Sequence, residues 1–306
     1  MPSSENQPFR SGFVSLVGRP NTGKSTLLNA LVGARLAIVA DKPQTTRTSI
    51  QGVLTLPGAQ IVFLDTPGIH RSKSLLNARM MEAVRAALDG RDLLLLVADS
   101  TVAPGEPDRE TLELLARRRA PVFLVLNKID RLRDKSALLV SIDRWRTKLE
   151  FAECIPISAL TGDGIETLKA AILDRLPEGP QYFPSDHITD QPERFLAAEI
   201  VREKILRLAR QEVPHAVAVL VESWEETPRL VRIHATVYVE RDGQKAILIG
   251  AKGSMLKRVG TLARAELESL TGRKVFLELF VKVLHGWREN PAFLKEMDWR
   301  SLAGVN

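Results

Sequence analysis

Eight consecutive residues near the N-terminus have the types and the spacing needed to bind phosphate. They are Gly18, Arg19, Pro20, Asn21, Thr22, Gly23, Lys24 and Ser25, and they match the pattern G-x-x-x-x-G-K-[ST]. The glycines allow backbone N–H groups to turn inward around a β-phosphate. Lys24 can then reach the β and γ oxygens, and Ser25 can offer its hydroxyl to Mg²⁺. An apolar run precedes the loop and a helical pattern follows it, as such a loop requires, so we predict a nucleotide site that extends to Thr26.

Three later segments place polar residues directly after predicted strands. They are Asp65-Thr66-Pro67-Gly68, Asn127-Lys128-Ile129-Asp130 and Ser158-Ala159-Leu160. The carboxyl ends of strands form the edge at which open α/β sheets bind ligands. One such segment is weak evidence by itself, but the whole set in this order is specific. The set resembles the motifs of the translation-factor-related class of P-loop GTPases.

That resemblance implies GTP or GDP, together with Mg²⁺, as the ligands. Asp65 would hold Mg²⁺ through water, and the Gly68 N–H would meet the γ-phosphate. A switch segment should follow the first helix, and Gln44-Thr45-Thr46-Arg47 fits it. Thr46 is our choice for the second Mg²⁺ hydroxyl, with Thr45 as the alternative. The expected magnesium ligands are therefore Ser25, Thr46 and Asp65.

The resemblance also implies how the base would be recognised. Asn127 would tie its loop to the phosphate-binding loop, and the stem of Lys128 would lie along the base. The Asp130 carboxylate would accept hydrogen bonds from guanine N1 and N2, which adenine does not offer. The segment from Ser158 to Leu160 would present the Ala159 N–H to guanine O6. These roles favour GTP over ATP.

The hydrolysis step departs from the common GTPase pattern at one position. Many GTPases have a glutamine after the glycine of D-x-x-G, where it orients the attacking water, but here that residue is Ile69. An aliphatic side chain cannot hydrogen-bond water, so intrinsic hydrolysis should be slow or aided. In related GTPases an asparagine at the position of Asn21 is associated with bound K⁺, although a loop-shaping role is equally open. His70 is adjacent, but a single loop histidine is usually solvated. The residues expected to act in catalysis are Lys24, Thr46, Gly68 and Asn21.

These loops need a sheet to position them, and the hydrophobic pattern up to residue 176 predicts one. Apolar runs typical of buried strands lie at 13–17, 61–64, 93–98, 122–126 and 155–157. Helical patterns lie at 24–32, 75–88, 107–118, 135–149 and 164–176. This alternation predicts an α/β fold with a mostly parallel sheet and helices on both faces. Residues 50–56 and 60–64 flank a Pro-Gly turn, so one edge strand should be antiparallel.

The pattern changes after residue 176. Residues 176–192 are rich in proline and have little periodicity, which is typical of a linker. A helical pattern at 193–211 is followed by β-rich runs at 216–223 and 230–240, helical patterns at 244–249 and 255–270, and a strand at 274–283. This order predicts a second, smaller α+β domain.

A G-x-x-G loop lies between the last two helical patterns of this second domain. Its glycines would allow the backbone to approach nucleic-acid phosphates closely. Residues 243–265 contain five basic residues and no acidic one, which suits an anionic partner, although charge runs are usually solvated helix faces. The element order resembles the KH module in its bacterial form, type II, and implies binding of single-stranded RNA. The expected RNA-binding residues are Gly250, Ala251, Lys252, Gly253, Lys257 and Arg258.

Nearly the whole chain resembles the Era family of bacterial GTPases. Beyond the motifs above, the resemblance rests on residues 42–47, 277–279, 281–283 and 286–287. It implies a disordered extension at 1–10, a G domain at 11–176, a linker at 177–192 and a KH domain at 193–306. It also implies a monomer that acts in assembly of the 30S ribosomal subunit, binds small-subunit ribosomal RNA near its 3′ end, and associates peripherally with the inner membrane.

Composition narrows the class of protein without identifying a partner. A length of 306 residues suggests two domains, and a formal net charge of +6 is too mild to specify a ligand. No apolar run is long enough to span a membrane, and no signal-peptide pattern is present. A single cysteine, Cys154, excludes an internal disulfide framework. These features predict a cytoplasmic protein.

Two functions from different classes remain open at this point. In the first, GTP orders the segments around Thr46 and Gly68, hydrolysis releases them, and the linker passes the change to the RNA-binding module. In the second, the protein is a nucleotide-sensing RNA chaperone with negligible turnover, which Ile69 keeps possible. Single-turnover GTP hydrolysis with and without RNA and K⁺ would separate them.

Overall fold

The chain forms two compact units in the computed structural model, which describes residues 8–40, 42, 45–69, 74–209 and 216–299. The first unit comprises residues 1–37, 46–72 and 79–190, and the second comprises 38–45, 73–78 and 191–306. Gln44, His70, residues 1–7 and the end of the predicted helix at 193–211 lie outside the described residues. The second unit therefore includes two short segments from the nucleotide-binding part of the sequence.

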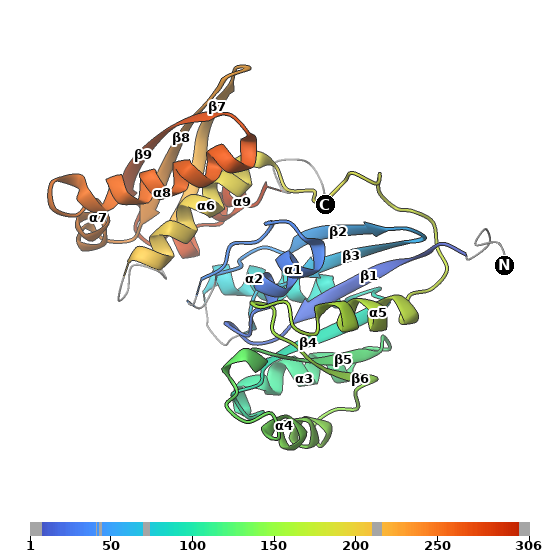
Figure 1. Ribbon diagram of the computed structural model, residues 1–306. Coiled ribbons are helices and arrows are strands. Elements are labelled where there is room, and N and C mark those ends of the chain that lie inside the picture. Colours follow the sequence, from blue (N-terminus) through green and yellow to red (C-terminus); the bar gives the residue numbers. More distant parts are fainter. Residues whose placement is uncertain (1–7, 41, 43–44, 70–73, 210–215, 300–306) are drawn as a thin grey trace. The chain divides into compact units, whose positions relative to one another are not determined.

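The first unit is built on a six-stranded sheet in the order β2-β3-β1-β4-β5-β6 (Figure 1). Its strands are β1 (Arg10–Val17), β2 (Ile50–Leu56), β3 (Ala59–Asp65), β4 (Leu93–Asp99), β5 (Val122–Asn127) and β6 (Glu153–Pro156). Only the pair of β2 and β3 is antiparallel among the described strands of this sheet. The prediction of a mostly parallel sheet with an antiparallel edge hairpin is confirmed.

Helices cover both faces of this sheet because its inner strands are apolar on both sides. Leu93 and Leu95 of β4 belong to the core with α1 and α5, whereas Leu94 and Leu96 belong to the core with α2, α3 and α4. The helices are α1 (Lys24–Val32), α2 (Leu75–Leu88), α3 (Arg109–Ala116), α4 (Ala137–Arg146) and α5 (Ile165–Arg175). α3 starts later than its pattern because Pro107 lies in a separate 3-10 turn, Glu106–Asp108.

Residues 177–190, which we call the strap, lie along the first unit although their composition is typical of a linker. Gly179 N donates to Phe9 O (3.0 Å), and Val53 N donates to Ile188 O (2.8 Å). The buried amide of Gln60 donates to Phe183 O (2.9 Å) and accepts from the N–H groups of Tyr182 (2.8 Å) and Phe183 (2.9 Å). Hydrophobic periodicity contains no signal for this contact because a polar side chain and irregular backbone form it.

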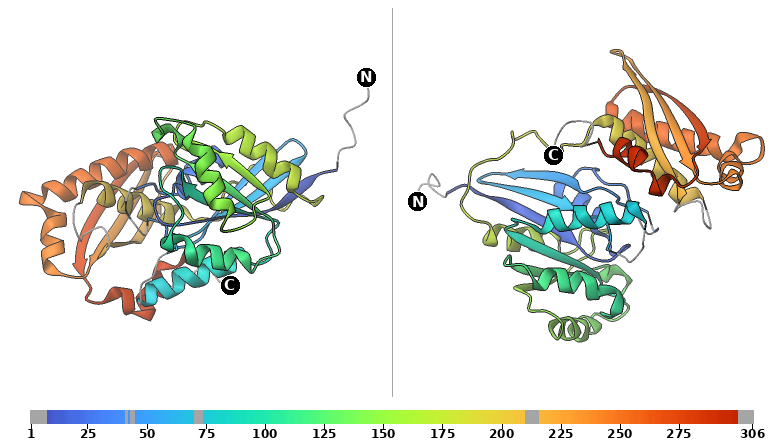
Figure 2. Two further views of the ribbon diagram at one scale, coloured as in Figure 1. Left: turned by 90° about the horizontal axis from the view of Figure 1, so that it is seen from below. Right: turned by 180° about the vertical axis from the view of Figure 1, so that it is seen from behind.

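The second unit packs helices against one face of a three-stranded sheet (Figure 2). β7 (Ala218–Glu226) is antiparallel to β8 (Leu230–Val239), and β8 is parallel to β9 (Lys274–Val283). The apolar residues of α6 (Glu193–Leu208) and α8 (Ser254–Thr271) form the core with this sheet. α7 (Asp242–Ile249) precedes the G-x-x-G loop, and α9 (Pro291–Met297), which the sequence did not predict, buries Phe293.

Within the described residues, every helix is too short or too polar to cross a bilayer.

Candidate functional site

The phosphate-binding loop connects β1 to the amino end of α1. The helix begins at Lys24, directly after Gly23, whose φ of 93° lies in the left-handed region. Lys24 Nζ donates to the carbonyl oxygens of Gly18 (3.0 Å) and Arg19 (2.8 Å). Burial lowers the pKa of Lys24 to about 8, and the charge of Asp65 opposes this shift. A lysine at the amino end of a helix is a suitable group for phosphate oxygens.

The loop after β3 lies directly against the phosphate-binding loop. A Cβ atom on Gly68 would lie 2.7 Å from Pro20 Cα, so the contact requires glycine. Ile69 N donates to Gly18 O at 3.4 Å. The Ile69 side chain is only 2% exposed and belongs to the hydrophobic core. This residue is therefore unable to orient an attacking water, both by its chemistry and by its position.

Oxygen atoms of Ser25, Thr46 and Asp65 converge beside the phosphate-binding loop. Ser25 Oγ lies 2.8 Å from Thr46 Oγ1 and donates to Asp65 Oδ2 at 2.7 Å. Burial raises the pKa of Asp65 to about 6, although Lys24 and the two hydroxyls oppose this shift. Its Oδ1 is buried without a hydrogen-bond partner among the described residues. Two hydroxyls beside a carboxylate with an unpaired oxygen form a set of hard oxygen donors that fits Mg²⁺.

Thr45, the alternative to Thr46, uses its hydroxyl elsewhere. Its Oγ1 donates to the carbonyl oxygens of Ala40 (3.1 Å) and Lys42 (2.6 Å). Thr46 Oγ1 instead donates to Asp65 Oδ2 at 3.3 Å. The structure thus favours Thr46 as the hydroxyl that accompanies Ser25.

The side chain of Asn127 ties the loops after β5 and β6 to the phosphate-binding loop. Its Nδ2 donates to Thr22 O at 2.9 Å, and its Oδ1 accepts from Ala159 N at 2.9 Å. The Ala159 N–H, expected to meet guanine O6, thus has a partner within the protein. Ser158 Oγ donates to Asp130 Oδ1 at 2.6 Å. This bond orients the Asp130 carboxylate, which is exposed and so accessible to a base.

Among the other predicted residues of the nucleotide loops, two threonines stabilise the loop backbone. Thr22 Oγ1 donates to Arg19 O at 3.1 Å, and Thr66 Oγ1 donates to Leu16 O at 2.8 Å. Both bonds fix the backbone of a loop. Thr26 lies in the first turn of α1, Pro67 is buried, and Leu160 is 76% exposed.

Asp99, which the motifs of the sequence do not include, connects two of these loops. It ends β4 and accepts from Lys128 Nζ at 2.7 Å, and the same Nζ donates to Asn21 O at 2.5 Å. Burial would raise the pKa of Asp99, but hydrogen bonds from Lys128 and Thr101 together lower it. Asn21 has a φ of 63°, which is a left-handed conformation, and the bond from Lys128 stabilises this backbone from outside the loop. The signal in the sequence was an acid at the end of an apolar strand.

Asp108 is a second acidic residue that supports the phosphate-binding loop. It is 3% exposed, lies 2.9 Å from Arg19 Nε, and accepts from Gly105 N at 2.9 Å. Burial raises its pKa, while the bond from Gly105 and the charge of Arg19 oppose the shift. Nothing in the sequence distinguished this acid from the exposed acids of the same helical pattern.

The G-x-x-G loop has backbone conformations that glycine favours. Gly250, Lys252 and Gly253 have φ values of 70°, 51° and 77°. A Cβ atom on Gly250 would lie 2.8 Å from Met255 Cβ. The side chains of Lys252, Lys257 and Arg258 are exposed around the amino end of α8, an 18-residue helix. Cations beside a helix amino end suit the phosphates of a nucleic-acid backbone.

A phosphate-binding loop and three further nucleotide motifs at the carboxyl edge of a mostly parallel sheet define a P-loop GTPase. The second unit adds a KH domain. A family model described as "50S ribosome-binding GTPase" matches residues 13–128, and one described as "KH domain" matches residues 212–288.

Relatives in other bacteria show the particular family. GTPase Era of Geobacter metallireducens is 52% identical over 296 residues, which cover 96% of this chain and 99% of that protein. GTPase Era of Crocosphaera subtropica is 47% identical, with 95% and 93% covered. The chain belongs to the Era family, and it is a GTP hydrolase.

Two solved structures of Era match nearly the whole chain. The structure of Era in complex with MgGDPNP and nucleotides 1506–1542 of 16S ribosomal RNA has a TM-score of 0.93 and 41% identity. It covers 95% of this chain and 99% of that one. A variant of Era from Aquifex aeolicus bound to GDP·AlF4⁻ has a TM-score of 0.92, with the same identity and coverage. The predicted P-loop GTPase fold with a C-terminal KH domain is confirmed.

Proposed function

We propose that this protein is a GTP/GDP switch that binds small-subunit ribosomal RNA near its 3′ end and acts in assembly of the 30S subunit. The observation that supports this most directly is the match over 95% of the chain to Era bound to MgGDPNP and nucleotides 1506–1542 of 16S ribosomal RNA. The chain has its own loops for both ligands, because the nucleotide motifs lie in the first unit and the G-x-x-G loop lies in the second.

In this proposal, each nucleotide motif has a separate task. The phosphate-binding loop and Lys24 hold the β- and γ-phosphates, and the Gly68 N–H meets the γ-phosphate. Ser25 and Thr46 would hold Mg²⁺ directly and Asp65 through water, and the bound ion would supply positive charge beside the phosphates. The Asp130 carboxylate selects guanine, and Asn127 keeps its loop at the correct distance from the phosphate-binding loop.

Hydrolysis needs a group that Ile69 does not supply. Asn21 is exposed, and Lys128 fixes its backbone, so its side chain is available to hold K⁺ beside the phosphates. We expect single-turnover GTP hydrolysis to be faster in K⁺ than in Na⁺, and Asn21→Ala to remove that difference. Equal rates in the two salts would instead point to the RNA complex as the source of the missing group. Turnover too slow to measure with RNA and K⁺ together would favour the chaperone alternative.

The RNA site of the proposal is the G-x-x-G loop with its exposed cations. Residues 250–253 contact the backbone of single-stranded RNA, and Lys257 and Arg258 add charge from the first turns of α8. The family resemblance is the basis for the location and the oligomeric state that we expect. A cytoplasmic monomer with peripheral association at the inner membrane therefore stays a prediction.

Crosslinking to an RNA with the sequence of the 16S 3′ end tests this assignment. We expect crosslinks to the second unit whose yield depends on whether GTP or GDP is bound. Lys252→Ala should weaken RNA binding and reduce its dependence on salt, whereas Lys295→Ala, an exposed lysine of α9, should not. Crosslinks that avoid the second unit and ignore Lys252→Ala would overturn the RNA assignment.

A further inference from the structure

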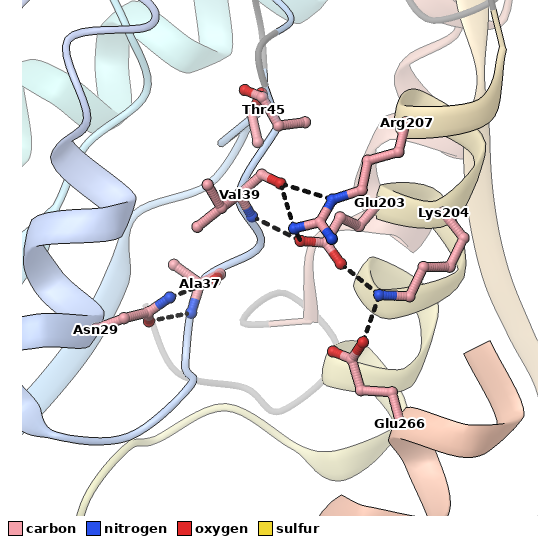
Figure 3. A network of polar contacts seen from close by, with 9 residues as sticks. Asn29, Ala37, Val39, Thr45, Glu203, Lys204, Arg207 and Glu266 are labelled. Atoms are coloured by element: carbon pink, nitrogen blue, oxygen red, sulfur yellow. Dashed lines mark hydrogen bonds and ion pairs between the residues drawn. The ribbon is translucent and has the colours of Figure 1, made fainter. Parts of the chain in front are cut away.

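Residues 38–45 connect α1 to Thr46, yet they belong to the second unit, where Val39 and Thr45 form hydrogen bonds with side chains of α6. Figure 3 shows the side chain of Glu203 pointing from α6 toward the backbone of Val39. Val39 N donates to Glu203 Oε1 at 3.0 Å, and Val39 O accepts from Arg207 Nη2 at 3.1 Å. Both polar backbone groups of Val39 are thus bound by side chains of one helix.

Glu203 is an unusual residue for such a contact because its side chain is fully buried. A buried carboxylate is costly unless several donors surround it. Here Lys204 Nζ lies 2.7 Å from Oε2, and Arg207 Nη2 lies 2.9 Å from Oε1. Segment 38–45 contributes the Val39 N–H as a further donor to this carboxylate.

The contact extends in two directions along the second unit. Arg202 Nη2 donates to Thr45 O, the residue that directly precedes Thr46. On the other side, Lys204 Nζ also pairs with Glu266 of α8, the helix that begins beside the G-x-x-G loop. Val39 and Thr45, near the two ends of segment 38–45, are therefore both bonded to α6. An ion pair connects α6 in turn to the helix of the candidate RNA site, as Figure 3 shows for Lys204 and Glu266.

A second segment next to a nucleotide motif has a similar contact. Residues 73–78 follow the Gly68 loop in the sequence and also belong to the second unit. Leu75 N, at the start of α2, donates to Glu289 Oε2 at 3.0 Å. The first turn of a helix has N–H groups without partners in the helix, so an acid from elsewhere can fix where the helix begins.

We propose that Glu203, supported by Arg207 and Arg202, is a positioning residue for Thr46 and so couples the GTP site to the RNA-binding unit. In this structure, segment 38–45 is docked on α6 while Thr46 Oγ1 lies beside Ser25 and Asp65, where it would hold Mg²⁺. Docking of the segment therefore favours the arrangement that binds GTP with Mg²⁺. The inference rests on the proposed switch function and assigns its coupling to α6 instead of the linker.

The test compares GTP and GDP affinities of the intact protein in Mg²⁺, with fluorescent GDP and a fluorescent non-hydrolysable GTP analogue. Glu203→Ala should weaken binding of the GTP analogue by about tenfold, the size expected for a hydrogen bond to a charged group, and change GDP binding less than about twofold. Glu203→Ala should also reduce the preference of RNA binding for one nucleotide, and since coupling between two sites is reciprocal, RNA should then change the GTP-to-GDP affinity ratio by an equally reduced factor.

Three further variants keep the test decisive. Arg207→Ala removes bonds to Val39 O from a side chain that is 51% exposed. The fold should tolerate it because Lys204 and the Val39 N–H remain as donors to Glu203, and the GTP-to-GDP affinity ratio should fall in the same direction. Glu203→Gln keeps an acceptor for Val39 N and should restore part of the ratio. Glu268→Ala removes a carboxylate of α8 that accepts from Val275 N of β9, and it should leave the ratio unchanged.

The results distinguish this inference from the proposed function. A wild-type protein that fails to bind GTP or RNA would sink the proposed function itself. A wild-type protein that binds both, with Glu203→Ala and Arg207→Ala variants that fold but keep the wild-type ratio of GTP to GDP affinity, would overturn only the coupling through α6.

Discussion

At the scale of single residues, burial of Asp65 disfavours the ionised form of its carboxyl group. It is fully buried, and its pKa of about 6 lies about two units above the ordinary value because burial penalises the ionised form. Two hydroxyls and Lys24 offset only part of that cost. A divalent cation at the proposed Mg²⁺ site would favour the ionised form, so Asp65 should destabilise the protein without Mg²⁺ and stabilise it with Mg²⁺ bound.

The raised pKa of Asp65 predicts a dependence of stability on pH. The folded protein binds more protons than the unfolded chain between pH 3.8 and about 6, so this residue lowers the free energy of unfolding as pH rises through that window. Without nucleotide and Mg²⁺, Asp65→Asn should be more stable than wild type at pH 7, by up to about 3 kcal/mol. The difference should vanish near pH 4. Urea unfolding in EDTA measures it, and a variant less stable than wild type at pH 7 would contradict burial as the cause of the raised pKa.

The two neighbouring threonines make a matched pair of variants. Thr46→Ala should weaken Mg²⁺-dependent binding of GTP by about tenfold, because it removes the proposed Mg²⁺ ligand beside Ser25. Thr45→Ala should change this affinity less than about threefold, because its hydroxyl donates to the carbonyl oxygens of Ala40 and Lys42 and not toward Ser25 or Asp65. Titration of a fluorescent GTP analogue with Mg²⁺ and with EDTA makes the comparison. An equal loss in both variants would remove the preference for Thr46.

At the scale of elements, the site depends on loops that hold one another at the ends of neighbouring strands. β4 lies between β1 and β5, and Asp99 at its end fixes Lys128 of one loop, which in turn fixes Asn21 of another. Parallel strands make this possible because their carboxyl ends meet at one edge. Asn127 adds a second tie between the same loops through Thr22 O.

Removal of the Asp99 tie should affect both nucleotides equally. Asp99→Ala should weaken GTP and GDP by about tenfold each, because the loop that holds the base serves both ligands. Asp134→Ala is a matched control, since that carboxylate, like Asp99, accepts from the N–H and hydroxyl of the residue two positions on. Unlike Asp99, it has no lysine partner within the described part of the chain. Fluorescence titrations with each nucleotide measure the effect. Selective loss of GTP would assign Asp99 to the γ-phosphate side instead.

At the scale of the whole molecule, the division into units does not follow the order of the chain. Segments 38–45 and 73–78 belong to the second unit, whereas the strap stays with the first. Gln60 is the centre of the strap contact, because both the nitrogen and the oxygen of its buried amide form hydrogen bonds with the backbone of residues 182 and 183.

The strap predicts an effect on stability far from both ligand sites. Gln60→Ala should lower the free energy of unfolding of the first unit by about 2–4 kcal/mol, since it leaves the backbone N–H groups of Tyr182 and Phe183 without their acceptor. Gln181→Ala, an exposed amide of the strap itself, should stay within about 0.5 kcal/mol of wild type. Urea unfolding of the full chain tests both, and nucleotide affinity below the transition should be unchanged.

The sequence predicted those features that repeat or that follow a motif. Alternating apolar runs predicted the sheet and its helices closely, and α1 and α2 have the predicted ends at 24–32 and 75–88. The nucleotide loops followed from residue type and spacing. Features made by single long-range polar contacts, such as Asp99 with Lys128, Glu203 with Val39 and Gln60 with the strap, were missed. A local pattern has no information about which distant backbone group a side chain will meet.

The strap also limits how far apart the two binding functions can act. If residues 177–192 were a free coil, their ends would lie ~20–25 Å apart on average. Because the strap extends to residue 190 and α6 starts at Glu193, the connecting chain can span at most about 11 Å. A short tether gives the tethered partner a high effective concentration. Once RNA captures the KH domain, the GTPase domain is thus confined to a small volume around that RNA, and any ribosomal group that aids hydrolysis must lie within this volume.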